Sequence, residues 1–480
     1  MIIGLESWTL ARPELFLAAI TGLLLIYGVV RGEMATPFVS LATSVALLVT
    51  AVLLFVPYRE GTAFASLFIV DRLTTTMKAL VLLGSAVAIL MSRAYFEQVK
   101  AWRFEYPLLV ALATLGMMLM ISANDLMALY VGLELQSLAL YVVAAFQRDS
   151  IRSTEAGVKY FVLGSVASGM LLFGASLIYG FCGGTAFVQV SHALLEGRGG
   201  EIGTVIGLVF VVTGLAFKVS AVPFHMWTPD VYEGAPTPVT ALFAVAPKIA
   251  AVSLLVSVLM GPFKPLFLQW QQIIVVASVL SMAWGAFAAL RQQNIKRLMA
   301  YSSIGNVGYV LLGLASGSEK GIQSVVFYLA IYAVMTLGVF AVILLMKRRG
   351  VMVEGIGDLA GLARSQPMMA FALLLFMFSL AGIPPLAGFW GKLYIFIAAV
   401  EAQLYVPAVL GVLASVVASY YYLRIVKVMY FDEPAEALDG PVFGVNRVVA
   451  FASAILVAAF SLAPQPLSLV AAAAAKGLFP

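Results

Sequence analysis

Charged residues are scarce in this chain: Asp, Glu, Lys and Arg make up 11% of its 480 residues, and 62% are hydrophobic. A soluble domain carries roughly 25% charged residues. So few charges cannot cover a surface in contact with water, and the mean hydropathy of +1.03 agrees. We therefore expect a single membrane-embedded bundle rather than several soluble domains.

Cysteine and histidine are almost absent, which excludes whole classes of cofactor. The single Cys182 allows neither a disulfide framework nor a four-cysteine cluster. Two histidines, His192 and His225, do not provide the paired helical ligands of a membrane haem, and His192 is expected to be a loop residue without a role. Because no phosphate-binding glycine motif occurs either, we expect no redox cofactor and no nucleotide on this chain.

The excess of basic residues reflects topology rather than binding to nucleic acid. The net charge is +5, and in membrane proteins Lys and Arg gather in the loops on the inner side. No nucleic-acid partner is therefore expected. Glu6 and Glu14 precede the first apolar run, which reads as a true span rather than a cleavable signal peptide.

Apolar runs of the length that crosses a bilayer, roughly 20 residues for about 30 Å, recur along the whole chain. They predict an all-α polytopic membrane protein of about 14 transmembrane helices. The expected spans lie near residues 13–30, 38–56, 73–92, 105–122, 125–146, 155–180, 202–221, 237–259, 271–290, 297–315, 322–345, 367–400, 404–428 and 445–463. The longest loops, near 183–201, 346–366 and 429–444, leave no room for a large soluble domain.

The distribution of Lys and Arg predicts the orientation. With the N-terminus outside, 16 fall on the inner side and 8 on the outer side, and four more lysines lie within spans. This bias predicts that both termini lie on the outer side. For a bacterial inner membrane, that side is the periplasm.

Glu134 is the only carboxylate expected near the membrane midplane. It lies about nine residues into its span, on the order of 14 Å deep. A charge at a helix centre costs roughly 2.5 to 3.5 kcal/mol, so such residues are functional candidates by default. The alternative is a structural ion pair between two helices.

Three lysines are expected at similar depth, each near a helix break. Lys218 precedes Pro223, and Lys248 directly follows Pro247. Lys392 follows Pro384 and Pro385, which are expected to divide the long twelfth span in two. Broken helices beside buried charges are typical of ion pathways. Snorkelling is the alternative for Lys218, and structural pairing is the alternative for the other two lysines.

Lys159 and His225 each allow either a functional or a structural interpretation. Lys159 lies about one turn into its span, where it either tunes Glu134 or snorkels to the surface. His225 follows the break at Pro223 and either hands protons between Lys218 and Lys248 or is structural.

Desolvation suggests a mechanism for such a set of residues. Removal of water favours the neutral form of a buried lysine, whereas a nearby carboxylate favours its charged form. Moving or neutralising the carboxylate would therefore release a proton, and its return would recapture one. Because each charge moved against 100 mV requires about 2.3 kcal/mol, the energy must come from another source.

At these residues the sequence resembles the antiporter-like membrane subunits of respiratory complex I, the proton-pumping NADH:quinone oxidoreductase. The similarity covers nearly the whole chain and is most specific in three segments. These are residues 217–238 (FKVSAVPFHMWTPDVYEGAPTP), 294–305 (NIKRLMAYSSIG) and 382–392 (GIPPLAGFWGK). The subunit N (subunit 2) type fits best, because the subunit M type has a glutamate where this chain has Lys392, and no long lateral helix is expected after the last span.

The resemblance implies two inverted repeats of five helices, each with one broken helix. It divides the chain into an N-terminal three-helix segment (1–104), a first repeat (105–260), a second repeat (271–430) and a C-terminal span (431–480). It makes Glu134 and Lys218 a coupled pair, Lys248 the central relay and Lys392 the exit group. Many relatives have a histidine where this chain has Asn306, which weakens a proton route through the tenth span.

The resemblance also implies partners and an energy source. Quinone reduction with NADH would take place elsewhere in the complex, the other membrane subunits and lipid would be the partners, and this chain would hold no cofactor. One alternative is a subunit of a multisubunit cation/proton antiporter with no redox partner. Another is a purely structural membrane scaffold.

Overall fold

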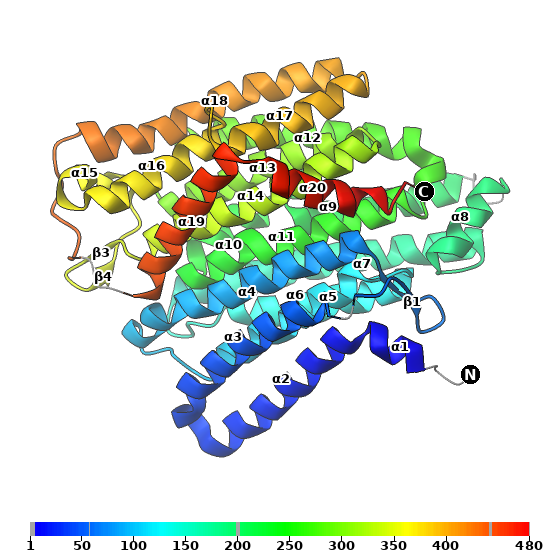
Figure 1. Cartoon of the computed structure of the whole chain (residues 1–480), viewed down its shortest axis with the longest axis horizontal. Helices are drawn as coiled ribbons and strands as arrows, with labels where there is room; N and C mark the ends of the chain where they lie inside the picture. Colours follow the sequence, from blue (N-terminus) through cyan, green and yellow to red (C-terminus); the bar gives the residue numbers. More distant parts are fainter. Residues whose placement is uncertain (1–4, 57, 198–201, 441–443, 480) are drawn as a thin grey trace.

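The computed structural model describes residues 5–56, 58–197, 202–440 and 444–479. Their secondary structure is almost entirely helical, which confirms the predicted fold class. Figure 1 shows long helices lying side by side, with α2 and α3 along one edge of the bundle and α17 and α18 along the opposite edge. The first helix, α1, and the C-terminal end of α20 lie toward the same end of the bundle.

The N-terminal part is a helical hairpin followed by a long helix. Its elements are α1 (Leu5–Leu10), α2 (Arg12–Arg31), η1 (Gly32–Ala35), α3 (Thr36–Leu53), β1 (Gly61–Ala63), β2 (Phe68–Val70) and α4 (Arg72–Gln98). The antiparallel pair β1–β2 leads into α4. The Asp71 side chain accepts a hydrogen bond from the Thr74 backbone, and the Thr74 hydroxyl accepts one from the Asp71 backbone, a capping box that fixes where α4 begins.

The middle part contains the first interrupted helix. Its elements are α5 (Glu105–Ile121), α6 (Leu126–Ala144), α7 (Ile151–Cys182), α8 (Phe187–Leu195), α9 (Ile202–Val219), α10 (Trp227–Gly234) and α11 (Thr237–Met260). The chain leaves the helical path at Ser220, whose φ is 65°, and resumes it at Trp227. The predicted break near Pro223 is confirmed.

The C-terminal part contains the second interrupted helix. Its elements are η2 (Lys264–Leu266), α12 (Phe267–Ala289), α13 (Ile295–Ala315), α14 (Glu319–Ile343), β3 (Lys347–Arg348), β4 (Val351–Met352), η3 (Ile356–Leu359), α15 (Leu362–Ser365), α16 (Pro367–Ala381), α17 (Ala387–Glu401), α18 (Tyr405–Phe431), α19 (Val445–Leu462) and α20 (Gln465–Lys476). β3 and β4 pair antiparallel. Gly382, with a φ of 85°, ends α16, and the two prolines follow, as predicted.

Eleven segments of the described chain are long and apolar enough to cross a membrane, and one of them, Arg12–Leu53, contains both α2 and α3. The shorter apolar helices Glu105–Ile121 and Pro367–Ala381 accompany them. The number fourteen and the inverted relation of the two repeats remain predictions. Short helices also form where none was expected. α20 follows Pro464 and packs on α14 and α4, so the segment 431–480 contains more than one helix. α8 lies within the expected loop 183–201 and contains His192, so the prediction of a loop at His192 was wrong; the helix forms because Phe187, Val190 and Leu194 share a buried face.

Burial separates the helices of the centre from those of the edge. The most apolar windows of α11, α13 and α14 are 94% buried, whereas that of α18 is 33% buried. Side chains such as Ile26 and Val30 on α2 and Val416 on α18 point outward. Because these exposed side chains are apolar, they are suited to contact with lipid. The polar residues of interest lie on or next to the central helices.

Candidate functional site

Lys218 lies in the last turn of α9, directly before the helix break, and is 5% exposed. Its ammonium donates hydrogen bonds to the Ser137 hydroxyl at 2.7 Å and the Tyr141 hydroxyl at 3.3 Å, both on α6. The carbonyl of Phe217 accepts a hydrogen bond from the indole of Trp227 across the break. The interruption therefore places a buried ammonium among neutral hydroxyls of the neighbouring helix.

Glu134 lies on α6, three residues before Ser137, on nearly the same helix face. Its side chain is half-buried, and its Oε1 is buried without a hydrogen-bond partner in the described chain. No direct ion pair with Lys218 forms among the described residues. Ser137 lies about one helical turn from Glu134 and accepts a hydrogen bond from Lys218, so a proton moving between the two groups can use that hydroxyl or water.

Lys248 occupies the centre of the most enclosed part of the bundle. It follows Pro247 on α11 and is 2% exposed. Its ammonium has no hydrogen-bond partner in the described chain and lies 5.5 Å from the ring centroid of Tyr232 on α10. A buried charge without a partner is costly, so this group requires water or exists in its neutral form.

Hydroxyl groups line the path from Tyr232 toward the second half of the bundle. The Tyr232 hydroxyl lies near Ser303 of α13, and Ser303 accepts a hydrogen bond from Tyr332 of α14 at 2.7 Å. The next residue on α13, Ser302, shares a hydrogen bond of 2.5 Å with Tyr422 of α18. Such alternating hydroxyls can both donate and accept protons.

Asn306 belongs to the same row of polar groups. Its amide nitrogen donates to Ser302 at 3.3 Å, and its oxygen accepts from the Tyr328 hydroxyl at 2.7 Å. An amide does not titrate near neutral pH, so this position is a fixed polar bridge in this chain rather than a proton acceptor.

Lys392 lies on α17 beside the second break and is 5% exposed. Its ammonium donates to the carbonyls of Leu380 and Ala381, both at 3.0 Å, and to the Ser415 hydroxyl at 2.9 Å. The break frees those two carbonyls, since the residues after them do not continue α16. A cavity of 10 Å³, about the size of one water molecule, separates Lys392 from Asn306 and Tyr422.

The secondary candidates lie elsewhere. The ammonium of Lys159 contacts Glu155 at 2.7 Å and Asp230 at 2.8 Å, so its partners are these carboxylates and not Glu134. His225 lies in the first break with its ring 5.8 Å from that of Trp284 on α12, and its Nδ1 has no partner in the described chain. The contacts of His225 include neither Lys218 nor Lys248 in the described part of the chain.

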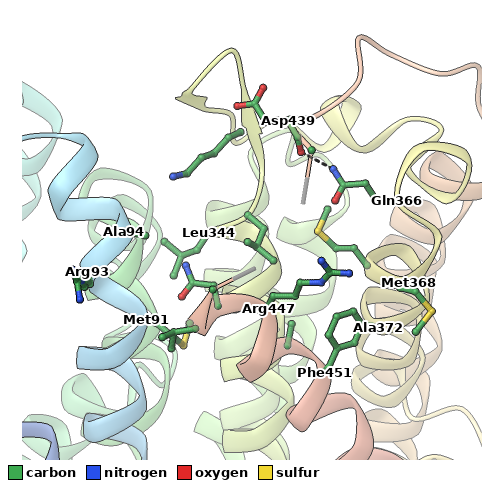
Figure 2. A pocket seen from close by; sticks show the side chains of 18 of the residues that line it. Met91, Arg93, Ala94, Leu344, Gln366, Met368, Ala372, Asp439, Arg447 and Phe451 are labelled. Atoms are coloured by element: carbon green, nitrogen blue, oxygen red, sulfur yellow. Dashed lines mark hydrogen bonds between the residues drawn. The ribbon is translucent and has the colours of Figure 1, made fainter. Parts of the chain in front are cut away.

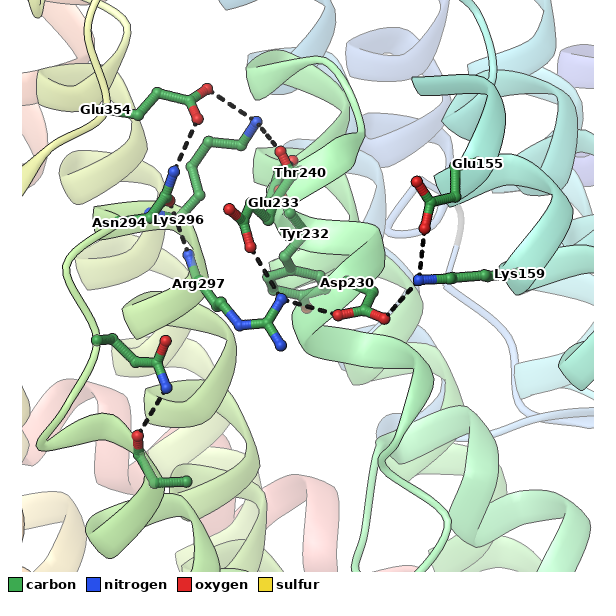
Figure 3. A network of polar contacts seen from close by, with 12 residues as sticks. Glu155, Lys159, Asp230, Tyr232, Glu233, Thr240, Asn294, Lys296, Arg297 and Glu354 are labelled. Carbon is green, nitrogen blue, oxygen red and sulfur yellow. Dashed lines mark hydrogen bonds and ion pairs between the residues drawn. The ribbon is translucent and has the colours of Figure 1, made fainter. Parts of the chain in front are cut away.

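A network of ion pairs at one end of the bundle was not predicted (Figure 3). Arg297 of α13 donates to Asp230 and Glu233 of α10, each at 2.8 Å. The neighbouring Lys296 is 2% exposed and contacts Glu354 at 3.0 Å. From sequence position alone, Lys296 and Arg297 were interpreted as ordinary cations of an inner loop. Their acidic partners lie 58 to 67 residues away in the sequence, so the pairing could not be recognised there.

A second buried ion pair was also missed. Lys78 of α4, assigned to the outer loops by sequence, is 2% exposed and contacts Glu14 of α2 at 2.5 Å. This pair joins the first helices to the rest of the bundle. Sequence spacing gave no signal for it, since 64 residues separate the partners.

Taken together, Lys218 and Lys392 lie buried beside interrupted helices with hydroxyl-bearing partners, and Lys248 lies buried between them in sequence, on α11, which continues through Pro247 without the expected break. These features define a polytopic membrane protein of the antiporter-like class. Among the described residues no cluster of His, Cys, Asp and Glu could hold a metal ion.

Comparisons with known proteins agree with this class. Residues 123–418 match the family model described as "NADH:quinone oxidoreductase/Mrp antiporter, TM". The chain belongs to this family.

Several curated relatives share the full length of the chain. NADH-quinone oxidoreductase subunit N of Paramagnetospirillum magneticum is 59% identical over 98% of this chain and 97% of that protein. Subunit N 1 of Rhizobium meliloti is 55% identical over 99% of both chains.

Solved structures show the same arrangement of helices. A chain of respiratory complex I from Thermus thermophilus, solved with bound aureothin, is 34% identical, with a TM-score of 0.82 over 96% of this chain and 99% of that one. A chain of the Mrp complex from Dietzia is 24% identical, with a TM-score of 0.84 over 99% of this chain and 98% of that one. At this identity the similarity shows a shared fold.

Proposed function

We propose that the chain is the subunit N type of membrane subunit of a NADH:quinone oxidoreductase and that it translocates protons. The names of full-length relatives at 55–59% identity support this assignment. The observation that carries the proton-translocating part is the burial of Lys218, Lys248 and Lys392, each at most 5% exposed. Unlike the buried Lys78 and Lys296, none of these three lysines forms an ion pair in the described chain, and buried charges of this kind are functional candidates by default.

The proposed route begins at the pair formed by Glu134 and Lys218. When Glu134 is ionised its negative charge favours the charged form of Lys218. When the carboxylate is neutralised or turns away, the desolvated ammonium releases its proton. The half-buried position of Glu134 allows this carboxylate to respond to events at the surface of the subunit.

The proton then passes inward to Lys248 and across the bundle to Lys392. Lys248 has no fixed hydrogen-bond partner, so its charged form is held only when water is present and it readily passes the proton on. Lys392 is held by two carbonyls and one hydroxyl, which stabilise its charged form. Water is required between these groups, and the small cavity beside Lys392 offers one such position.

The energy for proton translocation is supplied by other subunits of the complex, which are also the partners of this chain. NADH oxidation and quinone reduction take place on other subunits, and this chain contributes no redox chemistry of its own. The other membrane subunits are the direct partners. The chain lies in the inner membrane of a bacterium, and the bias of Lys and Arg supports an orientation with both termini on the periplasmic side.

The test is quinone-linked proton pumping in membranes that carry the whole complex with Glu134→Ala or Lys218→Ala. Either substitution is expected to lower pumping sharply while the complex still assembles. Pumping at the parental level in both variants would overturn the proposal. If Lys392→Met also assembled and pumped normally, the chain would be a structural scaffold.

A subunit of a multisubunit cation/proton antiporter is the second candidate. The matching family model covers both kinds of protein, and the fold is that of a chain in the Mrp complex from Dietzia. Growth under sodium stress separates the two, since loss of an antiporter subunit causes sodium sensitivity. Copurification after mild detergent extraction also separates them, because a complex I subunit brings redox partners with it.

A further inference from the structure

A large cavity of the described chain is separate from the row of buried lysines. Its volume is 680 Å³, and it lies among one end of α4 and α14 and the beginnings of α16 and α19 (Figure 2). Its wall is apolar, with Met91, Leu344, Ala372 and Phe451. Met368 lines the cavity and is 59% exposed, so the cavity opens at the lipid-facing surface of the helix bundle.

The rim of this cavity carries positive charge that the protein does not neutralise. Lys347 and Arg447 line it, and neither forms an ion pair within residues 5–56, 58–197, 202–440 and 444–479. The Arg447 guanidinium lies over the ring of Phe451 at 5.6 Å and reaches from α19 toward α16. A third cation, Arg93, is already paired with Glu97 at 2.9 Å.

Two acidic residues line the cavity: Glu97, the partner of Arg93, and Asp439. Both carboxylate oxygens of Asp439 accept backbone N–H bonds, from Arg349 at 2.7 Å and Gly350 at 2.8 Å. Among the described residues no ion pair joins Asp439 to Lys347 or Arg447, and its carboxylate is directed toward the backbone at Arg349 and Gly350 instead. The rim presents two free cations to whatever occupies the cavity.

A buried polar group without a partner also lines the cavity. Asn446 is 7% exposed, and its amide oxygen has no hydrogen-bond partner in the described chain. Buried polar atoms are nearly always satisfied in native proteins. The missing partner at Asn446 points to a ligand that brings its own polar headgroup into the cavity.

We propose that this cavity binds one anionic glycerophospholipid of the phosphatidylglycerol type. Its phosphate lies between Lys347 and Arg447, its headgroup hydroxyl reaches Asn446, and an acyl chain lies along the apolar wall and leaves past Met368. Basic pockets between transmembrane helices are suited to anionic lipid headgroups. The lipid fills the space between α19 and the helices α4, α14 and α16.

Photo-crosslinking on the intact complex tests this proposal. The probe is phosphatidylglycerol with a photoactivatable group on its acyl chain, incorporated into membranes that contain the complex. Mass spectrometry is expected to place the adduct on residues of the cavity wall, such as Met368 or Phe451. Unlabelled phosphatidylglycerol is expected to compete at the same concentration as the probe, and phosphatidylcholine is not.

Two sets of variants sharpen the test. Lys347→Gln with Arg447→Gln is expected to weaken competition by phosphatidylglycerol roughly 30-fold, which corresponds to about 1 kcal/mol for each charge removed. Ala372→Phe, which fills part of the apolar wall, is expected to reduce labelling without changing charge. The matched control is Lys427→Gln, which removes a cation that pairs with Asp432 outside the cavity and leaves labelling unchanged.

Equal competition by phosphatidylglycerol and phosphatidylcholine would overturn the proposal, and so would full labelling of the double variant. It would also be overturned if crosslinking showed that a segment of a neighbouring subunit occupies the cavity. If the double variant did not assemble, the comparison of the two lipids on the parental complex would still decide. The result does not depend on proton pumping, so it is independent of the proposed function.

Discussion

Lys296 is expected to be a main stabiliser of the junction between α10 and α13. Its ammonium, 2% exposed, donates to the carbonyls of Glu233 and Ala235 at 2.9 and 2.8 Å and pairs with Glu354 at 3.0 Å (Figure 3). Lys296→Met keeps the length of the side chain and removes its charge. The carbonyls of Glu233 and Ala235 then lose this donor, and the Glu354 carboxylate loses its cation and keeps only the hydrogen bond from Asn294 at 3.0 Å.

The size of the effect follows from burial. Removal of one partner of a buried ion pair costs about 3–5 kcal/mol, because the remaining charge is left uncompensated. The Glu354 side chain is 22% exposed, so water can reach it and the lower end of that range, about 3 kcal/mol, is expected. Glu354→Gln should cost less, since the two carbonyl bonds of Lys296 persist.

The assay is a double-mutant cycle on the thermal stability of the complex in detergent. Lys296→Met is expected to lower the midpoint of thermal inactivation more than Glu354→Gln does. The combined variant should be no less stable than Lys296→Met alone, because it no longer contains the carboxylate that is left without a cation in Lys296→Met. Strictly additive losses, or an unchanged midpoint for Lys296→Met, would refute the reasoning.

Further substitutions test the packing and the proposed route. Gly116→Ala would bring a methyl group to 2.9 Å from the Cα of Gln136 on α6. This overpacking should cost about 1–3 kcal/mol of folding free energy, so less assembled complex is expected on native gels. The control Gly169→Ala, with no atom within 4 Å of the added carbon, should assemble normally. Ser137→Ala removes the closest hydrogen-bond acceptor of Lys218 and should slow quinone-linked pumping less than removal of the lysine; a complete loss, or none, would contradict the bridging role. Ser415→Ala should reduce pumping only slightly, because two carbonyls still hold Lys392, and a block as deep as that of Lys392→Met would contradict this.

The helix breaks could be predicted because their causes are local. Pro223, and Gly382 followed by Pro384 and Pro385, interrupt the hydrogen-bond ladder wherever they occur in an apolar run. The depth of Lys248 was predicted by counting residues into its span, whereas Lys218 and Lys392 were chosen for the helix breaks beside them; all three are buried in the structure.

The pairings could not be predicted because they join distant segments. Lys78 and Lys296 look like loop cations near helix ends, and only the tertiary packing brings Glu14 and Glu354 to them. Glu134 was expected to be as deeply buried as the lysines, but depth along a helix does not fix which side of it faces the core. Its face of α6 is half-exposed in the single chain.

The C-terminal helix α20 was missed for a different reason. Gln465–Lys476 is alanine-rich and too short to span a membrane, so a search for apolar spans passes over it. Alanine has the highest helix propensity of all residues, and packing against α14 and α4 supplies the rest of its stability.

The most direct measurement is the number of protons pumped per NADH oxidised by the reconstituted complex with Lys248→Met. We predict that the complex assembles and transfers electrons to quinone, but that this ratio falls below that of the parent and of the control Lys427→Gln. A ratio equal to theirs would contradict a relay through the centre of this subunit.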